Sequence, residues 1–119
     1  MTQPIPQITE RDIKRLITRE FPNENYDEVY SILCVYGKES YEKESLRVYA
    51  DSIKLSEGKL ELLKKYIDAA KCDYRDIMSW AEYPTYSKSW SDMKDLSANE
   101  QNQIMDSDWQ QYQNWFNKN

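Results

Sequence analysis

The fold class of this chain is decided by residues 57–82, which read EGKLELLKKYIDAAKCDYRDIMSWAE. Apolar side chains recur in this stretch every third or fourth residue, at Leu60, Leu63, Ile67, Ala70, Tyr74, Ile77 and Ala81. This spacing places them on one stripe of an α-helix, which is typical of a helix that packs nearly antiparallel to its neighbours. The stretch therefore predicts one long helix, which ends before Pro84 because proline lacks the backbone donor that a helix needs.

Two further helices are marked by strong start signals. Thr9 is followed by Asp12, and Ser97 is followed by Glu100, each at the spacing of a capping box. In a capping box two side chains bond the backbone N–H groups that the first helical turn leaves without partners. The sequence therefore predicts a first helix from Thr9 and a last helix from Ser97.

Residues 23–36 and 41–55 also show helical periodicity. In the second of these helices, charged residues including Arg47 and Asp51 are predicted to lie on the arc that the apolar stripes leave free. With no alternating strand pattern, we expect an all-α fold, a single-domain bundle of about five helices in a roughly antiparallel arrangement. The segments without periodicity are predicted to be an extended arm and a loop before the last helix, at residues 1–8 and 84–96.

Aromatic residues are unusually frequent in this chain. Its 119 residues include 10 Tyr and 4 Trp, and the length corresponds to one domain. Each aromatic ring can bury about 150–250 Å². We therefore expect a folded domain with an aromatic core and an aromatic surface.

The charge balance restricts the classes of partner. The formal net charge is −5 at pH 7, which disfavours attraction to nucleic acid and to anionic membranes. No apolar run approaches the roughly 18 residues of a membrane span, and residues 1–6 have no signal-peptide pattern. We therefore expect a cytoplasmic protein that binds neither nucleic acid nor membranes.

The chain offers few residues for catalysis, mainly carboxylates, Tyr, Lys and Arg. It has no histidine, which excludes Ser-His and Cys-His nucleophile pairs and the common zinc ligand sets. Gly37 and Gly58 are isolated, so there is no phosphate-binding glycine loop. Cys34 and Cys72 lie in helical patterns without metal-ligand spacing, and we expect them to be buried free thiols. We therefore expect a protein that is not an enzyme and uses no cofactor and no metal.

Two segments of the chain have a familiar pattern. Residues 73–84 read DYRDIMSWAEYP and residues 108–116 read DWQQYQNWF. Both resemble segments of small bacterial all-helical proteins of unknown function, and the resemblance covers roughly residues 46–117. It implies a bacterial source and a compact helical fold, and it implies no activity.

The first candidate site is a contact face for another protein. It combines aromatic rings with charges near the end of the long helix and in the loop after it, and Trp, Tyr and Arg are the residues that dominate protein–protein binding energy. The alternative is a structural network in which the same charges pair and the rings bond at the edge of the bundle. The candidate partner-binding residues are Arg75, Trp80, Glu82, Tyr83, Tyr86 and Trp90.

Two carboxylates are predicted to be structural and buried. Asp108 lies within the apolar arc of the last helix, one turn from Ile104 and Tyr112, and Asp73 borders the apolar stripe of the long helix. An unpaired buried charge costs several kcal/mol. We therefore expect Asp108 to be partly buried and bonded to an Arg, a Tyr hydroxyl or a Trp N–H.

These features favour a non-enzymatic protein-binding or regulatory module with an acidic and aromatic contact face. Its partner is another protein or a second copy of the chain, which would form a homodimer. The alternative is an acidic inhibitor of a basic target, in the manner of an immunity protein or an antitoxin. Salt distinguishes the two functions, because high ionic strength slows charge-driven association and affects an aromatic interface little.

Overall fold

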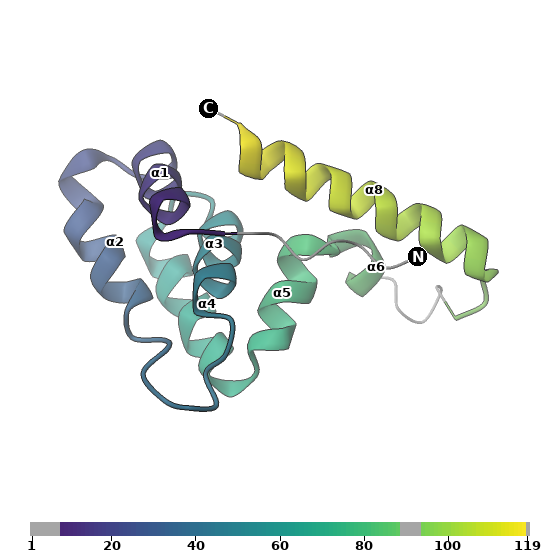
Figure 1. The fold of residues 1–119 in the computed structure, drawn as a ribbon, viewed down its shortest axis with the longest axis horizontal. Coiled ribbons are helices and arrows are strands. Elements are labelled where there is room, and N and C mark those ends of the chain that lie inside the picture. The colour runs from purple at the N-terminus through teal and green to yellow at the C-terminus, as the bar shows by residue number, and fades with distance from the viewer. Residues whose placement is uncertain (1–7, 89–93, 119) are drawn as a thin grey trace.

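A computed structural model describes residues 8–88 and 94–118, and every regular element within them is a helix. The expected all-α class is therefore confirmed, while the described residues contain seven α-helices rather than five (Figure 1). A short 3-10 turn (Asn23–Asn25) precedes the second helix. The α-helices are α1 (Glu10–Glu20), α2 (Tyr26–Leu33), α3 (Ser45–Ser56), α4 (Leu60–Cys72), α5 (Tyr74–Glu82), α6 (Pro84–Lys88) and α8 (Ala98–Asn117).

Both predicted capping boxes are confirmed. The Thr9 hydroxyl accepts the backbone N–H of Asp12 at 3.2 Å, and the Asp12 carboxylate accepts the backbone N–H of Thr9 at 3.0 Å. Ser97 and Glu100 make the same reciprocal pair, with distances of 3.2 and 3.3 Å. Local side-chain chemistry therefore determines where α1 and α8 begin.

The prediction of one long helix over residues 57–82 is wrong, because the stretch forms two helices, α4 and α5. Asp73 separates them in an extended conformation, with φ −159° and ψ 103°. Its carboxylate accepts the backbone N–H and the guanidinium of Arg75, both at 3.0 Å. Asp73 is thus the N-cap of α5, with a side chain 36% exposed, and its predicted burial is also wrong.

Helix α3 lies at the centre of the fold and contacts α1, α4 and α5. It begins at Ser45, four residues later than predicted, because Glu44 adopts a left-handed conformation with φ 58°. Figure 1 shows α3 between α1 and α4. This position explains why α3 is apolar over so much of its circumference.

Buried side chains from α1 to α5 form one cluster, which we call the aliphatic core. All of its members except Phe21 and Tyr36 are aliphatic. The expected aromatic residues lie around this cluster and in α8: six partly buried rings pack against it, and Trp109 and Tyr112 are buried in α8. The aliphatic core comprises Ile13, Leu16, Ile17, Phe21, Val29, Ile32, Leu33, Tyr36, Val48, Ala50, Ile53, Leu63, Ile67, Ala70 and Ile77.

Helices α6 and α8 form a separate layer on one side of this core. Helix α6 occupies residues 84–88, so the predicted loop over 84–96 is wrong for these residues. Residues 89–93 of the predicted loop lie outside the described part of the chain. Helix α8 contacts α5 and α6 and extends along one side of the molecule (Figure 1). The predicted arm at residues 1–8 likewise lies outside the described residues except for residue 8.

The C-terminal end of α8 is held by two arginines of α1. Arg15 donates to the backbone carbonyl of Phe116 at 2.7 Å, and Arg19 donates to that of Lys118 at 2.5 Å. The two guanidinium groups also lie over the rings of Phe116 and Trp115, 5.2 and 4.9 Å from the ring centres. Cations therefore satisfy the free carbonyl groups at the negative end of the helix dipole.

Candidate functional site

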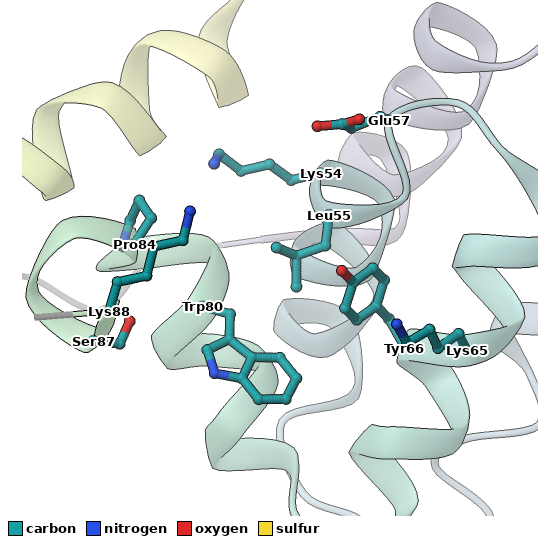
Figure 2. A pocket seen from close by; sticks show the side chains of 9 residues that line it. All are labelled: Lys54, Leu55, Glu57, Lys65, Tyr66, Trp80, Pro84, Ser87 and Lys88. Carbon is teal, nitrogen blue, oxygen red and sulfur yellow. The ribbon is translucent and has the colours of Figure 1, made fainter.

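A groove of about 530 Å³ opens where α4, α5, α6 and the C-terminal end of α3 meet (Figure 2). Its volume lies in the range of about 300–1,000 Å³ that ligand-binding pockets usually have. Each of the four helices contributes side chains to it, so the groove is a product of the tertiary fold. It is lined by Lys54, Leu55, Glu57, Lys65, Tyr66, Trp80, Pro84, Ser87 and Lys88.

Aromatic rings form one wall of the groove. The rings of Tyr66 and Trp80 meet edge to face, with their centres 6.3 Å apart and their planes at 68°. Trp80 is nevertheless 42% exposed, and Leu55 lines the groove beside it. Contact with Tyr66 holds the Trp80 ring while leaving much of its surface open to a partner.

Positive charge surrounds this wall. Lys54, Lys65 and Lys88 line the groove together with one carboxylate, that of Glu57. None of the three lysines forms an ion pair with another residue in the described part of the chain. Burial lowers the pKa of Lys54, an effect that the neighbouring carboxyl groups of Asp51, Asp108 and Glu57 partly offset. The groove therefore carries a local positive charge within an acidic protein.

Glu82 lies in the interior rather than on a contact face. It is fully buried at the end of α5, where its two carboxylate oxygens accept hydrogen bonds from Arg47 of α3 at 2.7 and 2.5 Å. This two-bond geometry is the strongest form of an Arg–carboxylate pair. The prediction that Glu82 contacts a partner is therefore wrong, because the fold uses this carboxylate to join α3 and α5.

Asp51 of α3 is a second buried carboxyl group beside this pair. It is fully buried, and neither of its oxygens makes a well-formed hydrogen bond to a described residue. Burial raises its pKa well above the usual value, and the neighbouring charge of Glu82 raises it further. Tyr112 of α8 and Arg47 have the opposite effect and lower the pKa of Asp51. The prediction that Arg47 and Asp51 lie on a free arc of α3 is wrong, because α5 and α8 cover that arc.

Asp108 confirms the expectation of a buried, bonded carboxylate in α8. It is buried, and it accepts the backbone N–H of Tyr86 at 2.9 Å. The donor is a main-chain group of α6 rather than the side chain that we expected. This bond joins α6 to α8, and it gives Tyr86 a structural role in addition to its predicted contact role.

The other predicted contact residues do not gather at the groove. Tyr83 is half-buried and stacks on Trp109 of α8, with ring centres 6.2 Å apart. Arg75 is exposed at the start of α5, where it pairs with Asp73. Trp90 lies outside the described residues. Trp80 is therefore the only one of the six candidates that lines the groove among the described residues.

The lysines of the groove were missed by sequence reasoning. Lys54, Lys65 and Lys88 belong to three different helices and share no motif.

Cys34 is half-buried and Cys72 is exposed, so the expectation of a buried thiol is wrong for Cys72. Within residues 8–88 and 94–118, no group of three His, Cys, Asp or Glu side chains lies close enough to hold a metal ion.

Comparison of the chain with models of protein families, with curated proteins and with solved structures finds no match. The resemblance of residues 73–84 and 108–116 to small bacterial proteins therefore stays a prediction. In the described part of the chain, no helix combines the length and the apolar character needed to cross a membrane.

Proposed function

We propose that this chain is a non-enzymatic protein-binding module whose contact surface is the groove around Trp80. The observation that supports this most directly is the exposure of Trp80, at 42%, on the wall of a groove built by four helices. Tryptophan is the residue most enriched among those that dominate binding energy, especially where it stands beside a concave surface. A cytoplasmic location is part of the proposal, and the two free cysteines support it.

The other described tryptophans are more buried than Trp80, and this contrast supports the choice of Trp80. Trp109 is buried between the rings of Tyr83 and Tyr112, and Trp115 lies under the guanidinium of Arg19. Their apolar surface already stabilises the docking of α8. The open surface of Trp80 contributes less to folding and is available to a partner.

The test is affinity capture from a lysate of the source cells with three immobilised proteins: wild type, Trp80→Ala and Tyr41→Ala. Tyr41 is 64% exposed and lies outside the groove, so it controls for the loss of an exposed ring. We expect wild type and Tyr41→Ala to retain the same partner and Trp80→Ala to lose it. Equal capture by all three proteins would contradict the proposal.

An acidic inhibitor of a basic target is the second candidate function, and the net charge of −5 favours it. Such an inhibitor depends on long-range attraction, so raising the salt concentration should slow its association with the target steeply. Its capture should not depend on Trp80. Capture by Trp80→Ala therefore separates the two functions, because only an inhibitor should still bind its target.

A further inference from the structure

We propose that the groove binds an acidic peptide segment of a partner protein, with an apolar side chain of that segment inserted against Trp80. The inference rests on the proposed function and names the chemistry of the partner. It follows from the charges around the groove and from the apolar surface between them.

The charges around the groove favour an anionic partner. Lys54, Lys65 and Lys88 come from α3, α4 and α6, and in Figure 2 the Lys54 and Lys88 ammonium groups lie near each other, whereas Lys65 lies beside Tyr66. They have no ion-pair partner among the described residues, whereas the chain as a whole has a net charge of −5. A partner segment with carboxylates would therefore find complementary charge here, although the rest of the protein repels it.

The position of Lys54 adds a reason for an anion inside the groove. Its side chain is half-buried, and burial makes its charged form less stable than in water. A carboxylate placed next to the ammonium group replaces part of the lost hydration with a charge-assisted hydrogen bond. The half-buried ammonium group of Lys54 therefore favours a negatively charged ligand group in the groove.

The apolar part of the groove requires an apolar side chain in the ligand. Trp80, Tyr66, Leu55 and Pro84 all line it. A purely acidic segment would leave these surfaces in contact with water, whereas an inserted aromatic or branched side chain would bury them. Three lysines supply few of the phosphate contacts on which binding to a nucleic acid depends.

The first experiment selects ligands without assuming their sequence. Short random peptides displayed on phage are bound to the wild-type protein after peptides that bind Trp80→Ala have been removed. We expect the selected peptides to be enriched in Asp and Glu around one large apolar residue. Enrichment of basic or uncharged peptides would overturn the inference, and so would the absence of any peptide that depends on Trp80.

The second experiment measures the affinity of the most enriched peptide for four proteins by calorimetry. Relative to wild type, we expect Trp80→Ala to bind about 30-fold more weakly, as for a typical anchor residue. The double variant Lys65→Glu/Lys88→Glu should bind about tenfold more weakly. Its matched control is Lys14→Glu/Lys64→Glu, which changes the net charge equally at exposed lysines outside the groove. Equal weakening by the two double variants would contradict a charge effect specific to the groove.

The outcomes separate this inference from the proposed function. If lysate capture depends on Trp80 but the selected peptides are not acidic, the protein-binding function stands and the acidic ligand is wrong. If neither depends on Trp80, both proposals fail. Sedimentation of the protein alone tests a second copy of the chain as the ligand, since a dimer that Trp80→Ala dissociates would also contradict the acidic segment. Circular dichroism confirms beforehand that each variant is folded.

Discussion

The two sides of helix α3 are stabilised by different chemistry. One side contributes Val48, Ala50 and Ile53 to the aliphatic core. The other carries Arg47 and Asp51, which meet Glu82 of α5 and Tyr112 of α8; we call these four residues the polar layer. The aliphatic core depends on shape and volume alone, whereas the polar layer depends on charge pairing and on the protonation of Asp51.

This comparison shows how α8 is attached to the rest of the fold. Its buried residues Trp109 and Tyr112 do not belong to the aliphatic core, and they extend a row of stacked rings that begins at Tyr83. Beside this row the polar layer takes the place of aliphatic packing. The attachment of α8 should therefore respond to pH and to the loss of single charges, whereas packing within the aliphatic core should not.

Removing Arg47 should have the largest effect. Arg47→Ala leaves the fully buried carboxylate of Glu82 without its partner, which typically costs about 3–5 kcal/mol. Urea unfolding at pH 7 measures this loss. The control is Arg75→Ala, which breaks an exposed pair and should cost far less. Similar losses for both variants would show that water reaches Glu82.

A cavity in the aliphatic core should cost almost as much but should not depend on pH. Leu63 is fully buried, and Leu63→Ala should destabilise the protein by about 2–5 kcal/mol. Because no charge is involved, the loss should be the same at pH 5 and at pH 8. A pH-dependent loss would mean that the two sides of α3 are energetically coupled.

Because the pKa of Asp51 is raised in the fold, the protein should become less stable as the pH rises. The pKa of Asp51 in the folded protein lies well above its value of about 3.9 in the unfolded chain. Below a pH of about 3.9 Asp51 holds its proton in both the folded and the unfolded protein. Above it only the folded state keeps the proton, so the free energy of unfolding falls by up to about 1.4 kcal/mol per pH unit until the folded pKa is reached.

Asp51→Asn removes this titration and so tests it. The variant should gain stability relative to wild type as the pH rises from 5 to 7, which urea unfolding at each pH measures. Arg47, Glu82 and Tyr112 surround the group in both proteins. A constant difference between variant and wild type would show that the pKa of Asp51 is not raised in the fold.

Glu42 should show the smallest effect, with the opposite sign. Its carboxylate accepts the ammonium of Lys71 at 2.8 Å and three backbone N–H groups of residues 37–39. These hydrogen bonds, chiefly that from Lys71, lower the pKa of Glu42 to about 2. The stability that they provide is present above the unfolded pKa of about 4.3 and is lost as the pH falls towards 2.

Glu42→Gln should therefore lose stability at pH 6 and little at pH 2. Thermal unfolding at both values measures the difference. Glu39→Gln is the control, because the Glu39 side chain is exposed. A loss that is equal at pH 2 and pH 6 would contradict the lowered pKa.

Periodicity and capping chemistry predicted most of the fold from sequence. The starts of α1 and α8 and the buried stripe of α4 and α5 followed from local patterns. The break between α4 and α5 did not, because the stripe continues through Asp73 without a change of phase. The sequence did contain a signal for this break, because Asp73 followed by Asp76 has the spacing of a helix start.

The groove and the polar layer could be predicted only in part. Trp80 was identified as a contact residue from its type, but the lysines around it come from helices far apart in sequence. Asp51 lies three residues after Val48 and four before Leu55, so this spacing could have predicted its place on an apolar stripe. Its partners Glu82 and Tyr112 were not, because a single sequence does not show which distant side chains meet.

The most direct test of the groove as contact surface is hydrogen–deuterium exchange of the full chain, with and without the partner that lysate capture identifies. We predict slower exchange on binding at residue 80 and in the groove segments 54–57, 65–66 and 84–88, and unchanged exchange in α1 and α2. Protection confined to α1 and α2, with the groove unchanged, would contradict the account.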